Sequence, residues 1–149
     1  MSPPNHDDVV LLLPRLRRYA RVLTGNPREA DDLVIEAVRY AREEGRRPAL
    51  QRLMAIAHAL HRDARVHRGR AVLERLQRSI LRRRTDPLVE QLGALPLDER
   101  AALALVAVER FDYADVAEVL DVPVATAMET LARARARLRG AARESQRAR

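Results

Sequence analysis

The sequence FDYADVAEVLDVPVATAMETLARARARLR, residues 111–139, decides the fold because it predicts a helix, a four-residue turn and a second helix. Small and apolar residues recur at helical spacing before Asp121 and again from Val124 onwards. Pro123 ends the first helix, since proline disfavours the α conformation in the residue before it. Two short helices joined so tightly cross steeply, as in a helix-turn-helix, whose second helix can enter a DNA major groove. Helical hairpins that bind no DNA share this pattern, so it predicts the shape and leaves the function open.

Upstream of this stretch the sequence predicts further helices and no strand. An apolar stripe at residues 16–23 ends before Gly25, and Asn26 followed by Pro27 is a strong start for the next helix. That helix has apolar residues at helical spacing and ends at Gly45. The remaining predicted helices cover residues 48–69, 71–83, 85–92 and 96–110.

The chain is therefore predicted to be all-α, with two small helical domains. The first domain covers residues 7–68, and the second, which contains the helix-turn-helix, covers residues 87–140. A basic linker at residues 69–86 joins them, and a polar tail follows at residues 141–149.

Charge is unevenly distributed along the chain. Residues 62–84 hold nine arginines and two acids, a net charge of +7, and residues 132–149 hold seven arginines and one acid, a net charge of +6. Residues 85–131 hold two arginines and ten acids, a net charge of −8. We expect nucleic acid to be attracted by the first two segments and repelled by the third. All 28 basic residues are arginine, which suits phosphate recognition but is equally typical of a GC-rich genome.

Composition also excludes several classes of function. Cysteine is absent, so the chain has neither disulfides nor thiolate zinc sites, which fits a reducing compartment. No apolar run approaches the ~20 residues of a membrane span, and the first residues lack a signal-peptide pattern, so we expect a cytoplasmic protein without membrane contact. His58, His61 and His67 lack companion ligands at metal spacing, and we interpret them as the flank of a basic helix. Without a phosphate loop or catalytic motif, we expect no enzyme, cofactor or small-molecule substrate.

Two longer segments carry a resemblance to a known family. LLPRLRRYARVLTGNPREADDLVIEAV and LGALPLDERAALALVAVERFDYADVAEVLDVPVATAMETLARARARLR resemble the first and second domains of a bacterial sigma factor of the extracytoplasmic-function group. The resemblance covers roughly residues 9–140. It implies a first domain that docks on core RNA polymerase and a helix-turn-helix domain that reads the −35 promoter element.

In the family that this chain resembles, the polymerase-docking helix commonly contains Asp-Leu-Val-Gln-Glu. This chain has Asp-Leu-Val-Ile-Glu at residues 32–36. Ile35 replaces the polar glutamine and is expected on the face opposite the buried stripe. An outward isoleucine between charges suits a partner contact, although single exposed isoleucines are ordinary. The residues implied to face the polymerase or another partner are Asp31, Asp32, Ile35, Glu36 and Arg39.

The recognition helix departs further from the family pattern Gly-Thr-Val-Lys/Arg-Ser-Arg-Leu. Its basic residue, serine and arginine are replaced by Met128, Glu129 and Thr130. An arginine–guanine pair contributes about 1–3 kcal/mol of discrimination, so their loss weakens promoter reading. The arginines further along this helix suit contact with the DNA backbone more than base reading. The resemblance implies that Thr126, Glu129, Thr130 and Arg133 face the −35 groove, and that Arg135 and Arg137 bind DNA through its backbone.

The first domain is shorter than in the family and lacks its Trp-Leu pair. Aromatic residues make up 3% of the chain, so a pocket that stacks unpaired promoter bases is poorly supplied. Arg62, Arg65 and Arg68 are expected to follow the −10 backbone electrostatically.

These departures leave three hypotheses open. The first is a compact sigma factor that joins core polymerase to promoter DNA. The second is a sigma mimic, similar to the sigma-like half of the general-stress response regulator, which binds an anti-sigma factor and does not read DNA. The third is a helix-turn-helix regulator that binds DNA as a dimer.

Overall fold

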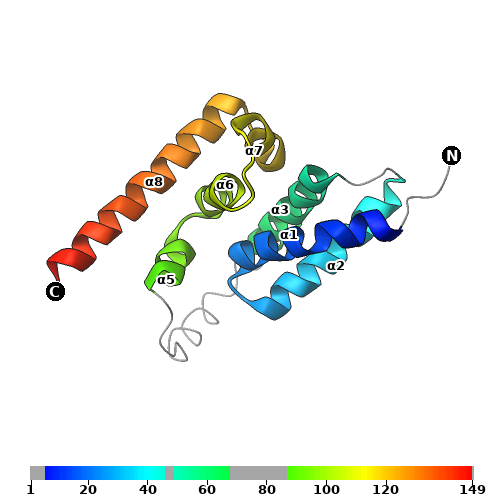
Figure 1. Cartoon of the computed structure of the whole chain (residues 1–149), viewed down its shortest axis with the longest axis horizontal. Coiled ribbons are helices and arrows are strands. Elements are labelled where there is room, and N and C mark those ends of the chain that lie inside the picture. The colour runs from blue at the N-terminus through cyan, green and yellow to red at the C-terminus, as the bar shows by residue number, and fades with distance from the viewer. Residues whose placement is uncertain (1–5, 46–48, 68–86, 149) are drawn as a thin grey trace.

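A computed structural model describes residues 6–45, 49–67 and 87–148 of the chain. Every regular element in these ranges is an α-helix, as the sequence predicts (Figure 1). The predicted basic helix at residues 71–83 and the whole of the predicted linker at residues 69–86 lie outside the described residues. The helices are α1 His6–Thr24, α2 Pro27–Glu43, α3 Leu50–His67, α5 Pro87–Ala94, α6 Leu97–Ala107, α7 Tyr113–Leu120 and α8 Val124–Arg147.

Helices α1, α2 and α3 pack together as a first unit. The turn between α1 and α2 follows the sequence prediction, because Gly25 has a φ of +67° and the Asn26 side chain accepts hydrogen bonds from the backbone N–H groups of Arg28 and Glu29. Pro27 begins the helix, where its missing N–H costs nothing. The predicted apolar face of α2 is buried, with Val38 half-buried at its edge.

Helices α6, α7 and α8 form the helix-turn-helix unit, and α5 lies against α8. The Asp112 side chain caps α7 by accepting from the Asp115 N–H at 2.8 Å. At the other end of α7, Asp121 has a left-handed φ of 55°, and the Val122 N–H donates to the Ala117 carbonyl at 3.0 Å. This is the hydrogen bond of a Schellman motif, and it turns the chain in three residues where we expected four.

The C-terminal ends of α6 and α8 differ most clearly from the sequence prediction. The helix expected to run to about Arg110 ends at Ala107, and Arg110 itself has a left-handed φ of 61°. The polar tail predicted at residues 141–149 is helical as far as Arg147, because α8 continues to that residue. Alanine and arginine are good helix formers, and the single Gly140 costs only about 1 kcal/mol relative to alanine.

The two units share one hydrophobic core. Helices α1 and α3 of the first unit lie against α6 and α7 of the second (Figure 1). Buried side chains from both sides belong to one continuous cluster, which includes Leu16, Leu53, Leu105 and Val116. The recognition helix α8 runs along the outside of this core. The units are thus arranged so that the outer faces of α2 and α8 remain open.

Candidate functional site

The outward face of α2 carries the residues that the resemblance associates with polymerase docking. Asp31, Asp32, Glu36 and Arg39 are all exposed, and the Ile35 side chain is 62% exposed. Leu33, Val34 and Ala37 on the opposite face fix the orientation of the helix, because they are buried in the core.

Two ion pairs order part of this face. Arg17 of α1 lies 3.5 Å from Asp31, with both side chains half-exposed, and Arg39 pairs with Glu36 one turn away. Such exposed pairs contribute about 0–1 kcal/mol, so a partner's charges can replace them at little cost. The face therefore offers acids, a base and one apolar side chain to a macromolecule.

The N-terminal half of α8 presents few groups that suit DNA. Val124 and Met128 are 45% and 49% exposed, and Glu129 is also exposed, whereas Thr126 is half-buried. Met128 stands where the resemblance implies a basic residue. An apolar pair one turn apart next to a carboxylate offers no phosphate contact.

The expectation that Thr130 faces the DNA groove is wrong. Thr130 is only 5% exposed, and its hydroxyl donates to the Thr126 carbonyl at 2.8 Å. It lies three residues after buried Ala127 and four before buried Ala134, so it shares the face that packs on the core. A base contact from this side chain would require α8 to rotate.

Arginines further along α8 remain at the surface, but two of them are engaged by a carboxylate. Arg137 Nε lies 3.0 Å from Glu99 Oε2, and Arg133 Nε lies 3.6 Å from Glu99 Oε1. Glu99 is buried, and its Oε2 makes no hydrogen bond, so the 3.0 Å contact is an ion pair without hydrogen-bond geometry. Arg133 and Arg137 therefore lean towards α6, whereas Arg135 is exposed on another side of the helix.

On α3, the side chains expected to follow the −10 backbone are exposed where the structure describes them. Arg62 and Arg65 project from the last turns of the helix, and Arg62 Nε lies 3.8 Å from Asp63. Arg68 lies outside the described residues. Two arginines near one acid give this helix end a weakly basic surface.

Sequence reasoning missed the polar contacts that join the two units. The Glu109 side chain, at the end of α6, is 1% exposed and receives Nε hydrogen bonds from Arg15 at 2.7 Å and Arg18 at 2.8 Å. Arg15 also donates to the Glu109 carbonyl at 2.7 Å, and its guanidinium carbon lies 5.6 Å from the Phe111 ring centroid. The hydrogen bond and charge of Glu109 raise the pKa of Arg18. Because these partners are more than 90 residues apart, no local pattern announces them.

A second polar chain crosses the same interface. The Tyr19 hydroxyl lies 3.3 Å from His58 Nδ1, and His58 Nε2 lies 3.0 Å from the Asp98 carboxylate of α6. A carboxylate only accepts, so Nε2 carries the hydrogen of the bond to Asp98. The hydrogen bond from His58 lowers the pKa of Asp98, and burial raises that of Tyr19.

The histidine interpretation made from the sequence is therefore wrong. His58 is 1% exposed and His61 is 7% exposed, so neither flanks a basic surface. Within the described ranges, no group of three or more histidines and acids could hold a metal ion.

The helices that the structure describes include none long and apolar enough to cross a bilayer.

Comparison with known families assigns the architecture to a class. Residues 85–138 match the family Sigma-70, region 4, and residues 9–54 match the Sigma2 domain of PhyR. The chain thus has the two-domain architecture of a sigma factor and is similar to the extracytoplasmic-function group. That class is regulatory and non-enzymatic.

A solved structure has the same arrangement. The sigma factor RpoE, in complex with the anti-sigma factor NepR from Bartonella quintana, aligns with a TM-score of 0.73 and 23% sequence identity. The alignment covers 92% of this chain and 95% of that one. At this identity the likeness establishes the sigma-factor fold over nearly the whole chain.

Proposed function

We propose that this chain acts in bacterial transcription initiation as a sigma-factor-like protein. Its first unit binds core RNA polymerase, and its helix-turn-helix lies against promoter DNA. The observation that carries the proposal is the outward face of α2, where Asp32, Ile35 and Glu36 are exposed at the positions that the resemblance gives to polymerase docking. The match of residues 85–138 to sigma-70 region 4 supports the DNA-facing role of the second unit.

In this proposal the DNA contact is mainly electrostatic. Arg135 on α8, together with Arg62 and Arg65 on α3, attracts phosphates, whereas Arg133 and Arg137 are held by Glu99. Base reading is weak, because Met128 and Glu129 occupy the outward positions at the start of α8. We therefore expect DNA affinity to fall steeply with salt and to depend little on sequence.

Binding to purified core polymerase tests the first half of the proposal. The full chain should co-elute with core polymerase in size-exclusion chromatography. Asp32→Arg should weaken the complex roughly tenfold by charge reversal at the interface, while Glu144→Arg, an exposed reversal on α8, should leave it unchanged. No binding by the unaltered chain, together with no promoter-directed transcript, would remove the proposal.

A sigma mimic is the second candidate, and the exposed apolar pair Val124 and Met128 favours it. An apolar patch on a recognition helix suits a protein partner better than DNA. NepR is the anti-sigma factor in the similar complex. A mimic would form a complex with a purified anti-sigma factor of that kind and restore run-off transcription by another sigma factor, yet support no transcript with core polymerase itself.

A dimeric helix-turn-helix regulator remains a third hypothesis. It requires self-association, which sedimentation of the chain with and without duplex DNA measures directly. A monomer under both conditions would exclude it.

A further inference from the structure

The buried carboxylate of Glu99, on α6, lies against the recognition helix α8. Within the part of the chain that the structure describes, it forms ion pairs only with Arg133 and Arg137. The Glu99 side chain is 6% exposed, whereas those of the two arginines are 54% and 59% exposed. Because α6 and α8 pack together and the arginines are one turn apart, both reach the same carboxylate. A buried acid thus draws two exposed guanidinium groups of α8 towards the core.

Arg133 has two further neighbours on its own helix. Its Nη2 donates to the Thr130 hydroxyl at 3.0 Å, and its Nη1 lies 4.0 Å from the Glu129 carboxylate. Glu129 and Thr130 are two of the residues that replace the DNA-facing side chains of the family pattern, so these replacements also engage the next arginine. Together, the two arginines and two glutamates of this cluster carry no net charge, and this flank of α8 attracts phosphates weakly.

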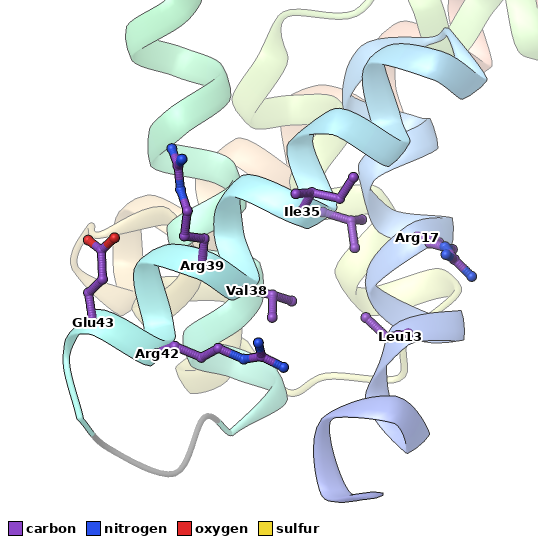
Figure 2. A pocket seen from close by; sticks show the side chains of 8 residues that line it. Leu13, Arg17, Ile35, Val38, Arg39, Arg42 and Glu43 are labelled. Atoms are coloured by element: carbon purple, nitrogen blue, oxygen red, sulfur yellow. The ribbon is translucent and has the colours of Figure 1, made fainter. Parts of the chain in front are cut away.

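Ion pairs on the first unit are easier to exchange. Arg17 on α1 and Arg39 on α2 project from its outer surface (Figure 2), and each pairs with a carboxylate that is itself about half exposed. Water solvates such a carboxylate when its arginine turns to a partner. Glu99 lacks this alternative, because release of its arginines would leave a buried charge without a counter-ion.

We propose that Glu99 lowers the affinity of α8 for nucleic acid by holding Arg133 and Arg137 in ion pairs within the protein. The inference rests on the proposed function, since it concerns the surface by which the second unit lies against DNA. A phosphate must displace a carboxylate that is already in place and shielded from water. Arg135, on another side of α8, forms no ion pair with any described residue and is available to phosphate at once.

Glu99→Gln in the full chain tests the proposal, because the amide keeps the size of the side chain and removes its charge. Fluorescence anisotropy with a labelled duplex of about 20 base pairs should show roughly tenfold tighter binding at low salt. The plot of log affinity against log salt should steepen by about one to two, since each added phosphate contact contributes about 0.9 to the slope. Glu144→Gln, which removes an exposed charge from the same helix, should change the affinity less than about twofold.

Arginine substitutions identify the contacts that the variant gains. In the unaltered chain, Arg135→Gln should reduce the salt slope by about one, whereas Arg137→Gln should change it little because that arginine is held by Glu99. In the Glu99→Gln background, Arg137→Gln should also reduce the slope by about one. An arginine that only neutralises a buried acid would show no such dependence on the background.

A second substitution guards against loss of folding. Glu99→Met fills a similar space without a polar atom, and replacement of a buried charge by an apolar side chain is often tolerated. It should give the same gain in DNA affinity as Glu99→Gln. Circular dichroism and urea unfolding identify the folded variants. Unchanged affinity and salt slope in folded Glu99→Gln and Glu99→Met would overturn the proposal, as would an equal gain in Glu144→Gln.

Elution from immobilised heparin separates this inference from the proposed function, because heparin is a polyanion that requires neither a promoter nor polymerase. Later elution of Glu99→Gln than of the unaltered chain supports the role of Glu99 even where the chain directs no transcript. Equal elution contradicts that role even where the unaltered chain binds polymerase and directs transcription.

Discussion

The outer helices of the two units, α2 and α8, present different side chains to the surface. On α2, the exposed positions around Ile35 carry Asp32, Glu36 and Arg39. On α8, the corresponding outward positions hold Met128 and Glu129, and Thr130 is turned inwards. The outer helices of the two units therefore differ in the chemistry of their exposed side chains, although both are fixed by buried stripes.

Packing explains why this separation is possible. The position of α8 depends on its buried stripe, Ala127, Leu131 and Ala134, and that stripe is intact. The outward positions make no core contacts, so their substitution costs little stability. The shape of a helix-turn-helix is thus retained by residues that never meet DNA.

The largest expected effect tests whether the two units behave as one body. Leu16 is fully buried in the shared core, and Leu16→Ala should lower the free energy of unfolding by about 3 kcal/mol. Because the core is continuous, urea unfolding should show one transition, shifted as a whole. Probes placed separately on α2 and α8 measure whether their curves coincide.

A two-step curve, in which only the α2 probe responds, would contradict the shared core. The two units would then unfold as independent domains. Leu131→Ala provides the matched change on the α8 side, since Leu131 is 2% exposed in the same cluster.

A smaller loss is expected when the polar contact between the units is altered. Glu109→Gln removes the charge that Arg15 and Arg18 share, and it should cost about 2 kcal/mol, less than for a fully buried pair because both arginines stay half-exposed. Chemical denaturation measures the change. Glu144→Gln, an exposed control, should stay within about 0.5 kcal/mol of the unaltered chain.

Much of the fold followed from local rules. Asn26-Pro27 marked the start of α2, and Asp121 to Pro123 marked the turn, because capping and proline geometry act over a few residues. The exposure of Ile35 also followed from helical period. Thr130 was misassigned although its spacing from Ala127 and Ala134 already placed it on the buried face.

The contacts between the units could not be derived in this way. Glu109 meets Arg15 from 94 residues away, and His58 meets Asp98 from 40 residues away. Such pairs depend on how two amphipathic surfaces meet, which no periodicity encodes. The burial of Glu109 just after α6 can be recognised only when the positions of Arg15 and Arg18 are known.

The recognition helix itself offers a third test. Met128→Arg with Glu129→Ser should raise DNA affinity roughly tenfold, because a phosphate contact is gained and a repulsive carboxylate is lost. Thr130 should be left unchanged, since an arginine there would have to enter the core. Fluorescence anisotropy with duplex DNA at two salt concentrations measures the gain.

Met128→Ala with Glu129→Ser separates the loss of repulsion from the new contact. An affinity that does not change in the arginine variant would mean that this face of α8 does not meet DNA. In that case α2 and α8 would differ in the macromolecules they bind as well as in their exposed side chains.

The smallest effect concerns pH. The hydrogen bond from His58 lowers the pKa of Asp98 in the folded state, so Asp98 stabilises the fold above its unfolded pKa of about 3.9. That contribution is lost as pH falls through the lower, folded value. Asp98 is about half exposed, so the difference should stay below about 1 kcal/mol.

Asp98→Asn should therefore flatten the decline of the unfolding free energy as the pH falls below about 4. Thermal denaturation across that window measures the slope. Asp63→Asn, an exposed carboxylate on α3, should leave the slope of the unaltered chain in place.

The left-handed residue at the end of α6 has a wider consequence. Arg110 stands between Glu109 and Phe111, and both of these neighbours contact Arg15 of α1. The left-handed torsion at Arg110 thus closes the turn that brings Glu109 and Phe111 onto α1. Glycine at 110 would keep this turn without strain, whereas a β-branched residue, which resists positive φ, would strain it and weaken the packing of α7 on α3 and α6.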